Sequence, residues 1–203
     1  TGLPSPLILA QSTEQVAHGV RNDLPRPYTT QRDWGALPEG TQAWAAVTAV
    51  EPSPDGQFIY VIHRCFENSC SGRPEPPILK FDYEGELMAA FGEGLFVFPH
   101  GATVDYEGNL WVADAQGNED IGHQVIKFNG EGEILMTLGQ RGIGGNGPDL
   151  LHSPNDVVID PEDGDVFVVD SHRRGMNNRI VHYTAEGEFI KEWGSKGSQR
   201  GQL

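Results

Sequence analysis

The stretch Val125-Ile126-Lys127-Phe128-Asn129-Gly130-Glu131-Gly132-Glu133 has altered copies on both sides of it in the chain. The earlier copy begins Ile78-Leu79-Lys80-Phe81 and reaches Glu84-Gly85-Glu86, and the later one begins Ile180-Val181-His182-Tyr183 and reaches Glu186-Gly187-Glu188. The copies start 47 and then 55 residues apart, and the apolar runs that follow them end in Phe91-Gly92, Leu138-Gly139 and Trp193-Gly194. A unit of this length repeated in tandem indicates a repeat architecture.

Each unit contains short alternating β-branched and aromatic runs separated by Asp, Gly and Asn turns, which predict four β-strands. The expected strands are 46–51, 58–64, 78–83 and 86–92, then 101–106, 109–114, 124–129 and 134–139, then 155–160, 165–170, 179–184 and 188–194. Tight turns are expected at Tyr106-Glu107-Gly108-Asn109 and Asp163-Gly164, because Gly and Asn accept the positive φ of such hairpins. Tandem four-stranded units predict an all-β fold, a β-propeller with blades at about 44–95, 96–145 and 151–197.

Residues 1–43 are rich in proline and show little periodicity, so we expect an extended leader without a long helix. Three blades cannot close a ring, and ring closure is what protects the strand edges of a propeller. We therefore expect the remaining blades to lie outside this chain, on a second chain or fragment that completes the propeller. A paired second copy, or a longer parent chain, would also complete it.

The net charge of −15 is spread along the chain, which argues against nucleic acid as a partner, because that binding depends on Lys and Arg that neutralise phosphates. A cation fits this charge better. The longest apolar runs are strand-sized, such as 157–159 and 166–169, and are far below the roughly 20 residues that span a bilayer. The composition therefore predicts neither a nucleic-acid partner nor a membrane segment.

The two cysteines, Cys65 and Cys70, flank a short segment with the composition of a loop. We expect a small disulfide, which implies an oxidising compartment and thus a secreted or periplasmic protein. Two free thiols are the alternative. A zinc site at these cysteines is disfavoured because no second Cys pair completes it.

One histidine enters the first strand of the second blade, in Phe98-Pro99-His100-Gly101. In a propeller this strand lines the central channel, so His100 is expected to point near the axis. The matching place in the third blade is held by Asn155, so the fold itself does not demand a histidine there. His100 is either a metal ligand or a hydrogen-bonded polar group.

Other polar residues recur at strand ends and are expected to serve the architecture. Asp114 and Asp170 end second strands, and Asn178-Arg179 precedes a third strand, where Asp and Arg tie blade loops together. Asp105 and Asp160 precede turns and are expected to accept hydrogen bonds within hairpins.

Several of these segments together resemble a known family. They are Ile62-His63-Arg64, Phe98-Pro99-His100-Gly101, Leu110-Trp111-Val112-Ala113-Asp114, His123-Gln124-Val125, Asn178-Arg179-Ile180-Val181 and Trp193-Gly194. From about residue 44 to residue 203 the chain resembles the NHL-repeat propeller of peptidyl-α-hydroxyglycine α-amidating lyase. The resemblance implies six blades, of which three are present in this chain.

The resemblance also implies two metals. Zinc is held in that family by three histidines from alternate blades, so His100 would be one ligand and the other two would lie beyond Leu203. A structural calcium takes backbone carbonyls that match Val50 and Ala102. Arg64 matches an arginine that contacts the substrate carboxylate, a role that suits its planar charged fork.

The chain departs from the family at the catalytic tyrosine, because His172 stands there in Asp170-Ser171-His172, ahead of a longer loop through Arg173, Arg174 and Met176. A histidine can transfer a proton near neutral pH but cannot supply a phenolate. His172 is therefore either a catalytic residue or an ordinary loop residue.

These residues lead us to expect a zinc-dependent enzyme that cleaves an α-hydroxy amide, or a related small carboxylated or peptide-derived substrate, in a lyase-type reaction. Arg64 and His172 would be its catalytic residues. A lactonase or hydrolase of similar architecture, and a non-catalytic NHL propeller that serves only as a binding platform, are the alternatives.

Overall fold

The computed structural model describes residues 25, 28–32, 34–41, 43–172 and 177–203. Most of the expected leader, and the loop residues Arg173, Arg174 and Met176, lie outside this part. Residues 34–203 form one compact unit. Its strands are β1 (Val47–Pro52), β2 (Phe58–His63), β3 (Ile78–Asp82), β4 (Leu87–Phe91), β5 (Pro99–Val104), β6 (Leu110–Asp114), β7 (Val125–Phe128), β8 (Ile134–Leu138), β9 (Pro154–Ile159), β10 (Val166–Asp170), β11 (Arg179–Tyr183) and β12 (Phe189–Trp193).

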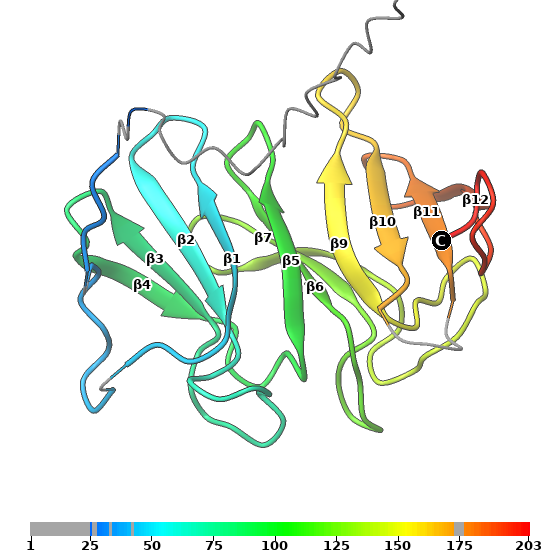
Figure 1. Ribbon diagram of the computed structural model, residues 1–203. Helices are drawn as coiled ribbons and strands as arrows, with labels where there is room; N and C mark the ends of the chain where they lie inside the picture. The colour runs from blue at the N-terminus through cyan, green and yellow to red at the C-terminus, as the bar shows by residue number, and fades with distance from the viewer. Residues whose placement is uncertain (1–24, 26–27, 33, 42, 173–176) are drawn as a thin grey trace, which may run out of the picture. The chain divides into compact units, whose positions relative to one another are not determined.

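These strands form three antiparallel sheets of four consecutive strands each, β1 to β4, β5 to β8 and β9 to β12. The first strands of the sheets, β1, β5 and β9, lie next to one another, as Figure 1 shows. The prediction of three four-stranded propeller blades, each with its first strand innermost, is confirmed. No helix in the described part of the chain has the length and apolarity to cross a membrane.

Glycine makes two of the predicted hairpin turns possible. Gly108 lies between β5 and β6 with φ of 83°, and Gly164 lies between β9 and β10 with φ of 82°. Residues with a Cβ rarely adopt this left-handed conformation. The hairpin role of aspartate is also confirmed, because Asp105 Oδ1 accepts the backbone N–H of Asn109 at 2.9 Å and Asp160 Oδ1 accepts that of Glu162 at 2.8 Å.

Neighbouring blades are joined by apolar side chains from facing sheets. Between the first and second blades the buried set is Tyr60, Ile62, Ile78, Phe91, Phe96, Ala102, Leu110, Val112, Ile126 and Phe128. Between the second and third blades it is Trp111, Ala113, Val125, Leu138, Leu151, Val157, Val166, Val168, Val181 and Tyr183. Each fully buried large side chain contributes about 1.5–3 kcal/mol, so these two cores set the relative positions of the blades.

The outer faces of the first and third blades differ. On the first blade, Leu79 and Phe81 are fully buried, and Trp34 and Trp44 pack against them. On the third blade, Val158 is 55% exposed and Trp193 is 41% exposed. The outer face of the third blade thus remains partly open, and on the first blade Val50, which pairs with Val61 on the same outer face, is likewise 56% exposed.

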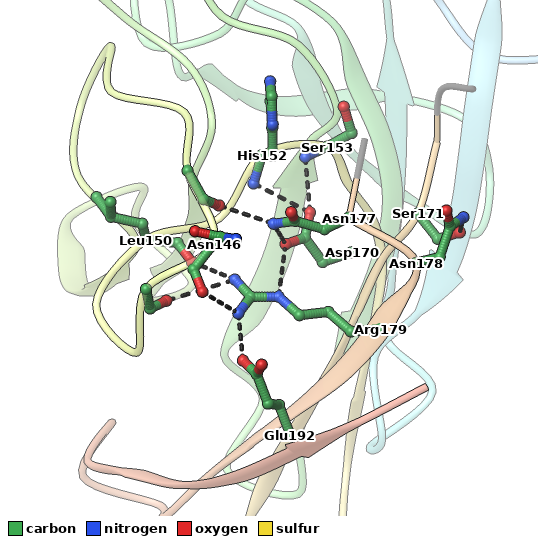
Figure 2. A network of polar contacts seen from close by, with 12 residues as sticks. Asn146, Leu150, His152, Ser153, Asp170, Ser171, Asn177, Asn178, Arg179 and Glu192 are labelled. Carbon is green, nitrogen blue, oxygen red and sulfur yellow. Dashed lines mark hydrogen bonds and ion pairs between the residues drawn. The ribbon is translucent and has the colours of Figure 1, made fainter. Parts of the chain in front are cut away.

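The third blade is tied to the loop before β9 by a buried carboxylate and a buried arginine (Figure 2). Asp170 accepts backbone N–H groups of His152 and Ser153 at 3.0 and 2.7 Å and the Nε–H of Arg179 at 3.2 Å. Arg179 also donates to the carbonyls of Asn146 and Leu150, at 2.8 and 2.6 Å, and to the carboxylate of Glu192. The predicted architectural role of Asp170 and Arg179 is confirmed.

The second blade repeats only half of this arrangement. Asp114 accepts backbone N–H groups of Val97 and Phe98 at 2.8 and 2.6 Å and has no exposed surface. Gln124 stands directly before β7, where Arg179 begins β11, so this carboxylate has no bonded arginine within its blade. Burial therefore raises the pKa of Asp114 to about 7, although backbone N–H donors, that of Gln116 included, and the charge of Arg64 act against the rise.

This raised pKa predicts a pH-dependent stability. Between the unfolded pKa of about 3.9 and the folded pKa of about 7, only the folded state holds the proton, so Asp114 makes the free energy of unfolding fall as pH rises through that window. The expected slope is at most about 1.4 kcal/mol per pH unit. Urea unfolding at several pH values, with wild type and Asp114→Asn compared, should show this component of the slope in wild type only. Parallel profiles would contradict the prediction.

Candidate functional site

The three candidate site residues come from three different blades and meet at one end of the sheets. Arg64 directly follows β2, His100 is the second residue of β5, and His172 lies two residues beyond β10. The rings of His100 and His172 are 4.5 Å apart between centroids, in an edge-to-face arrangement. Phe98 joins them to Arg64, because its ring lies 5.6 Å from that of His172 and 3.3 Å from Arg64 Cζ.

His100 is held by one ring nitrogen. Its Nδ1 lies 2.9 Å from the backbone carbonyl oxygen of Asn155 on β9. A carbonyl oxygen only accepts, so this contact assigns the proton to Nδ1 and the lone pair to Nε2. Burial, and then the charge of Arg64, lower the pKa of His100, which favours the neutral ring. A neutral imidazole whose other nitrogen is fixed by a carbonyl is the usual form of a zinc ligand, so His100 fits that role.

Arg64 is fixed on two sides of its guanidinium. Nε donates to the carbonyl of Pro99 at 3.2 Å, and Nη1 donates to Oδ1 of Asn68 at 2.8 Å. The plane rests on the Phe98 ring, a cation–π contact worth about 0.5–2 kcal/mol. Nη2 makes no hydrogen bond to the described residues, so one edge of the fork remains open to an anion.

His172 lies between His100 and a hollow. Besides its contacts with His100 and Phe98, it lines a hollow of about 540 Å³ together with Ser171, Asn178, Lys196, Gly197, Ser198 and Leu203. A molecule in this hollow would be within reach of the imidazole. The backbone N–H of His172 donates to the backbone carbonyl of Ser153 at 3.2 Å, which ties this residue to the start of β9.

The two residues expected to offer carbonyls to calcium occupy equivalent places in their blades. Val50 pairs with Val61, and Ala102, two residues after His100, pairs with Val112. Ala102 lines a hollow of about 360 Å³ whose other lining residues are Thr48, Ala49, Glu51, His100, Gly101, Asn155 and Asp156.

This hollow is rich in oxygen atoms. Burial and then the nearby charge of Asp156 raise the pKa of Glu51, so the two carboxyl groups are close enough to repel. Oδ1 of Asn155 is buried and has no hydrogen-bond partner among the residues that the structure describes. Oxygen donors of this kind suit a hard cation such as calcium.

A complete zinc site is not found within the described residues, where no three His, Cys, Asp or Glu side chains are grouped closely enough to hold a metal ion. The prediction that His100 is one ligand of several therefore needs ligands from outside this part of the protein.

Two residues at the site were missed from the sequence, Phe98 and Asn68. Phe98 directly precedes the Pro99-His100 pair, but an aromatic residue at the start of a strand is normally interpreted as part of the hydrophobic core. The predicted disulfide between Cys65 and Cys70 is confirmed. Asn68 lies within the loop that this disulfide closes. The signal for Asn68 was its place in a cross-linked loop that begins directly after Arg64.

Comparison with known proteins gives three informative relatives. Mouse peptidyl-glycine alpha-amidating monooxygenase is 36% identical over 148 residues, 71% of this chain and 14% of that protein. Drosophila melanogaster peptidyl-alpha-hydroxyglycine alpha-amidating lyase 1 is 30% identical over 203 residues, 91% of this chain and 36% of the lyase. Mouse NHL repeat-containing protein 3 is 29% identical over 128 residues, 61% of this chain and 36% of that protein. The chain thus spans at most 36% of the length of these relatives.

Solved structures agree on the fold. Hydrazine synthase of Kuenenia stuttgartiensis superposes with a TM-score of 0.51 at 16% identity, over 72% of this chain and 36% of that one. A chain in a nidogen/laminin complex superposes with a TM-score of 0.50 at 18% identity, over 71% of this chain and 46% of that one. No protein-family model matches the chain. These likenesses concern the fold, and the sequence relatives confirm the resemblance to the lyases. The described residues form three blades of an NHL-type β-propeller, and the chain is similar to the peptidyl-α-hydroxyglycine α-amidating lyases.

Proposed function

We propose that the chain forms part of a metal-dependent lyase that cleaves the C–N bond of an α-hydroxy amide bearing a carboxylate. The observation that carries this proposal is the meeting of Arg64, His100 and His172, from three blades, around Phe98. The names of the lyase relatives support the reaction class.

Each residue has one role in the proposed reaction. The open Nη2 edge of Arg64 holds the substrate carboxylate, because an arginine fork matches a carboxylate geometrically. His172 takes the proton of the α-hydroxyl group as the carbonyl forms. The C–N bond breaks, its electron pair passes to nitrogen, and nitrogen gains a proton, which leaves a primary amide and a 2-oxo acid.

Nε2 of His100 would hold zinc, together with ligands that lie outside the described part. Zinc, when bound, supplies Lewis acidity that stabilises negative charge on an oxygen atom. The carbonyls of Val50 and Ala102, beside the oxygen-rich hollow, would hold a structural calcium. The histidine at 172 suits proton transfer near neutral pH, where a tyrosine would be protonated.

We further propose that another four-stranded blade, on a second chain or fragment or in a longer parent chain, covers the open face of the third blade. Both other inter-blade junctions bury the equivalent face, and Trp193 and Val158 are too exposed to be a finished surface. Trp34 and Trp44 cover only part of the matching face of the first blade, where Val50 is 56% exposed, so pairing of two copies is the alternative arrangement. Gel filtration with intact mass tests this, and a stable 22.2 kDa monomer would overturn it.

The buried disulfide and the amidating relatives support a secreted or periplasmic location.

The proposed function is tested on protein purified with all blades of its propeller. We expect about one zinc per chain by elemental analysis, and release of a 2-oxo acid from an N-acyl-α-hydroxyglycine. Zinc without cleavage would favour a lactonase or hydrolase. Neither zinc nor cleavage would favour a non-catalytic binding platform, an alternative with which the name of the relative NHL repeat-containing protein 3 is compatible.

A further inference from the structure

The loop closed by the Cys65–Cys70 disulfide holds one arm of Arg64. The loop begins directly after this arginine, and Oδ1 of Asn68, inside the ring, accepts the hydrogen bond from Nη1 at 2.8 Å. Nε is engaged by the carbonyl of Pro99 at 3.2 Å. The positions of Nε and Nη1 are thereby fixed. Because the guanidinium group is planar, these two contacts also fix the direction in which Nη2 points.

The other end of the same loop holds the ring on which Arg64 rests. The backbone N–H of Cys70 and the hydroxyl of Ser69 both donate to the carbonyl of Val97, at 2.9 and 3.0 Å. Val97 directly precedes Phe98, whose ring centre lies 3.3 Å from Arg64 Cζ. One cross-linked loop therefore fixes both partners of the stack, which belong to different blades.

The loop keeps a backbone shape that does not form easily. Cys65 and Phe66 have φ values of 51° and 56°, in the left-handed region that residues with a Cβ rarely adopt. The N–H of Phe66 donates to Nδ1 of His63 at 3.1 Å, and Cys65 and Cys70 are 1% and 5% exposed. A covalent ring buried at both ends keeps this turn in place.

The propeller fold does not require such a loop. At the equivalent place the second blade continues with Ala115-Gln116 and the third with Ser171-His172, without cysteine. The cross-link occurs only beside the residue that faces the proposed substrate.

We propose that the disulfide-closed loop 65–70 is a positioning element for carboxylate recognition, with Asn68 as the residue that aims the guanidinium of Arg64. This inference rests on the proposed function. A bidentate contact between guanidinium and carboxylate depends on the direction of the fork. If Nη1 loses its hydrogen bond to Asn68, the guanidinium keeps its charge but is no longer held in that direction.

The test compares two small probes, N-acetylglycine, which carries the carboxylate, and its uncharged amide N-acetylglycinamide. Calorimetric titration is performed on zinc-loaded protein with all its blades. We expect Asn68→Ala to weaken N-acetylglycine binding about five- to tenfold, as the loss of one hydrogen bond implies, and to leave N-acetylglycinamide binding unchanged. Asn68→Asp should weaken N-acetylglycine further, because the new carboxylate pairs with the guanidinium, while the melting temperature holds.

Two further variants complete the comparison. Cys65→Ala/Cys70→Ala should show the same selective loss as Asn68→Ala; if it does not fold, the Asn68 pair decides, because both variants keep the disulfide. The matched control is Asn129→Ala, which removes an asparagine from the turn after β7, at the opposite end of the sheets.

If Arg64→Ala weakens N-acetylglycine while both Asn68 variants bind like wild type, the positioning role is overturned and the carboxylate site stands. If Arg64→Ala itself binds N-acetylglycine normally, the carboxylate is not held there, and the proposed function fails together with the inference. A loss by Asn68→Ala that is equal for both probes would show a general structural role and also overturn the inference.

Discussion

Replacement of His100 by alanine is expected to remove stoichiometric zinc and to lower the rate of α-hydroxy amide cleavage about a thousandfold or more. The fixed Nδ1 of this ring presents Nε2 as a ligand atom, and alanine offers nothing in its place. Metal catalysis is worth several kcal/mol of charge stabilisation, and each 1.4 kcal/mol is a factor of ten in rate. Elemental analysis and steady-state kinetics, on protein with all its blades, measure the two losses.

His152 provides the matched control for this variant. It also lies at the start of the third blade and faces another histidine, His123, at 5.5 Å between ring centroids, yet it has no contact with Arg64 or Phe98. His152→Ala should therefore keep both zinc and activity. Unchanged zinc content and full activity in His100→Ala, with a wild-type circular dichroism spectrum, would remove His100 from the mechanism.

Replacement of Arg179 by alanine should cost about 3–5 kcal/mol of unfolding free energy, the largest stability effect that we expect. Asp170 is fully buried, and removal of Arg179 leaves its carboxylate with hydrogen bonds but without a cationic partner. The variant also releases the carbonyls of Asn146 and Leu150, which tie the loop before β9 to the blade (Figure 2). Urea unfolding of the two proteins gives the difference directly.

Arg141 offers a surface comparison. Its Nε also donates to a backbone carbonyl, that of Asp120 at 2.9 Å, but the side chain is exposed. Arg141→Ala should cost less than about 1 kcal/mol, as exposed polar contacts do. Equal losses for Arg141→Ala and Arg179→Ala would show that burial of the pair with Asp170 adds nothing.

The fold could be predicted from the sequence because the strand pattern of one blade occurs three times in it. One copy of the Val125-Ile126-Lys127-Phe128 pattern could be a strand in any β protein, but the shared offset to Glu-Gly-Glu fixes the phase of every unit. Strand bounds agree with the structure to within about two residues, and the hairpin glycines Gly108 and Gly164 lie where positive φ is needed.

The site was only partly predictable. Arg64, His100 and His172 were singled out, and the structure brings them together, although their roles stay predictions. Phe98 and Asn68 escaped because their importance arises from contacts across blades, and a repeat pattern does not encode which loops of different blades touch.

The placement of one site residue on each blade has a consequence for how such proteins can diverge. His172 stands where the resemblance expects a tyrosine, and its backbone N–H is bonded to the carbonyl of Ser153 in its own blade, while Arg64 and His100 belong to other sheets. An exchange on one blade therefore leaves the backbone that carries the other two residues in place. The residue proposed for proton transfer could therefore be exchanged independently of those proposed for metal and anion binding, which would make the propeller a modular scaffold for changing chemistry.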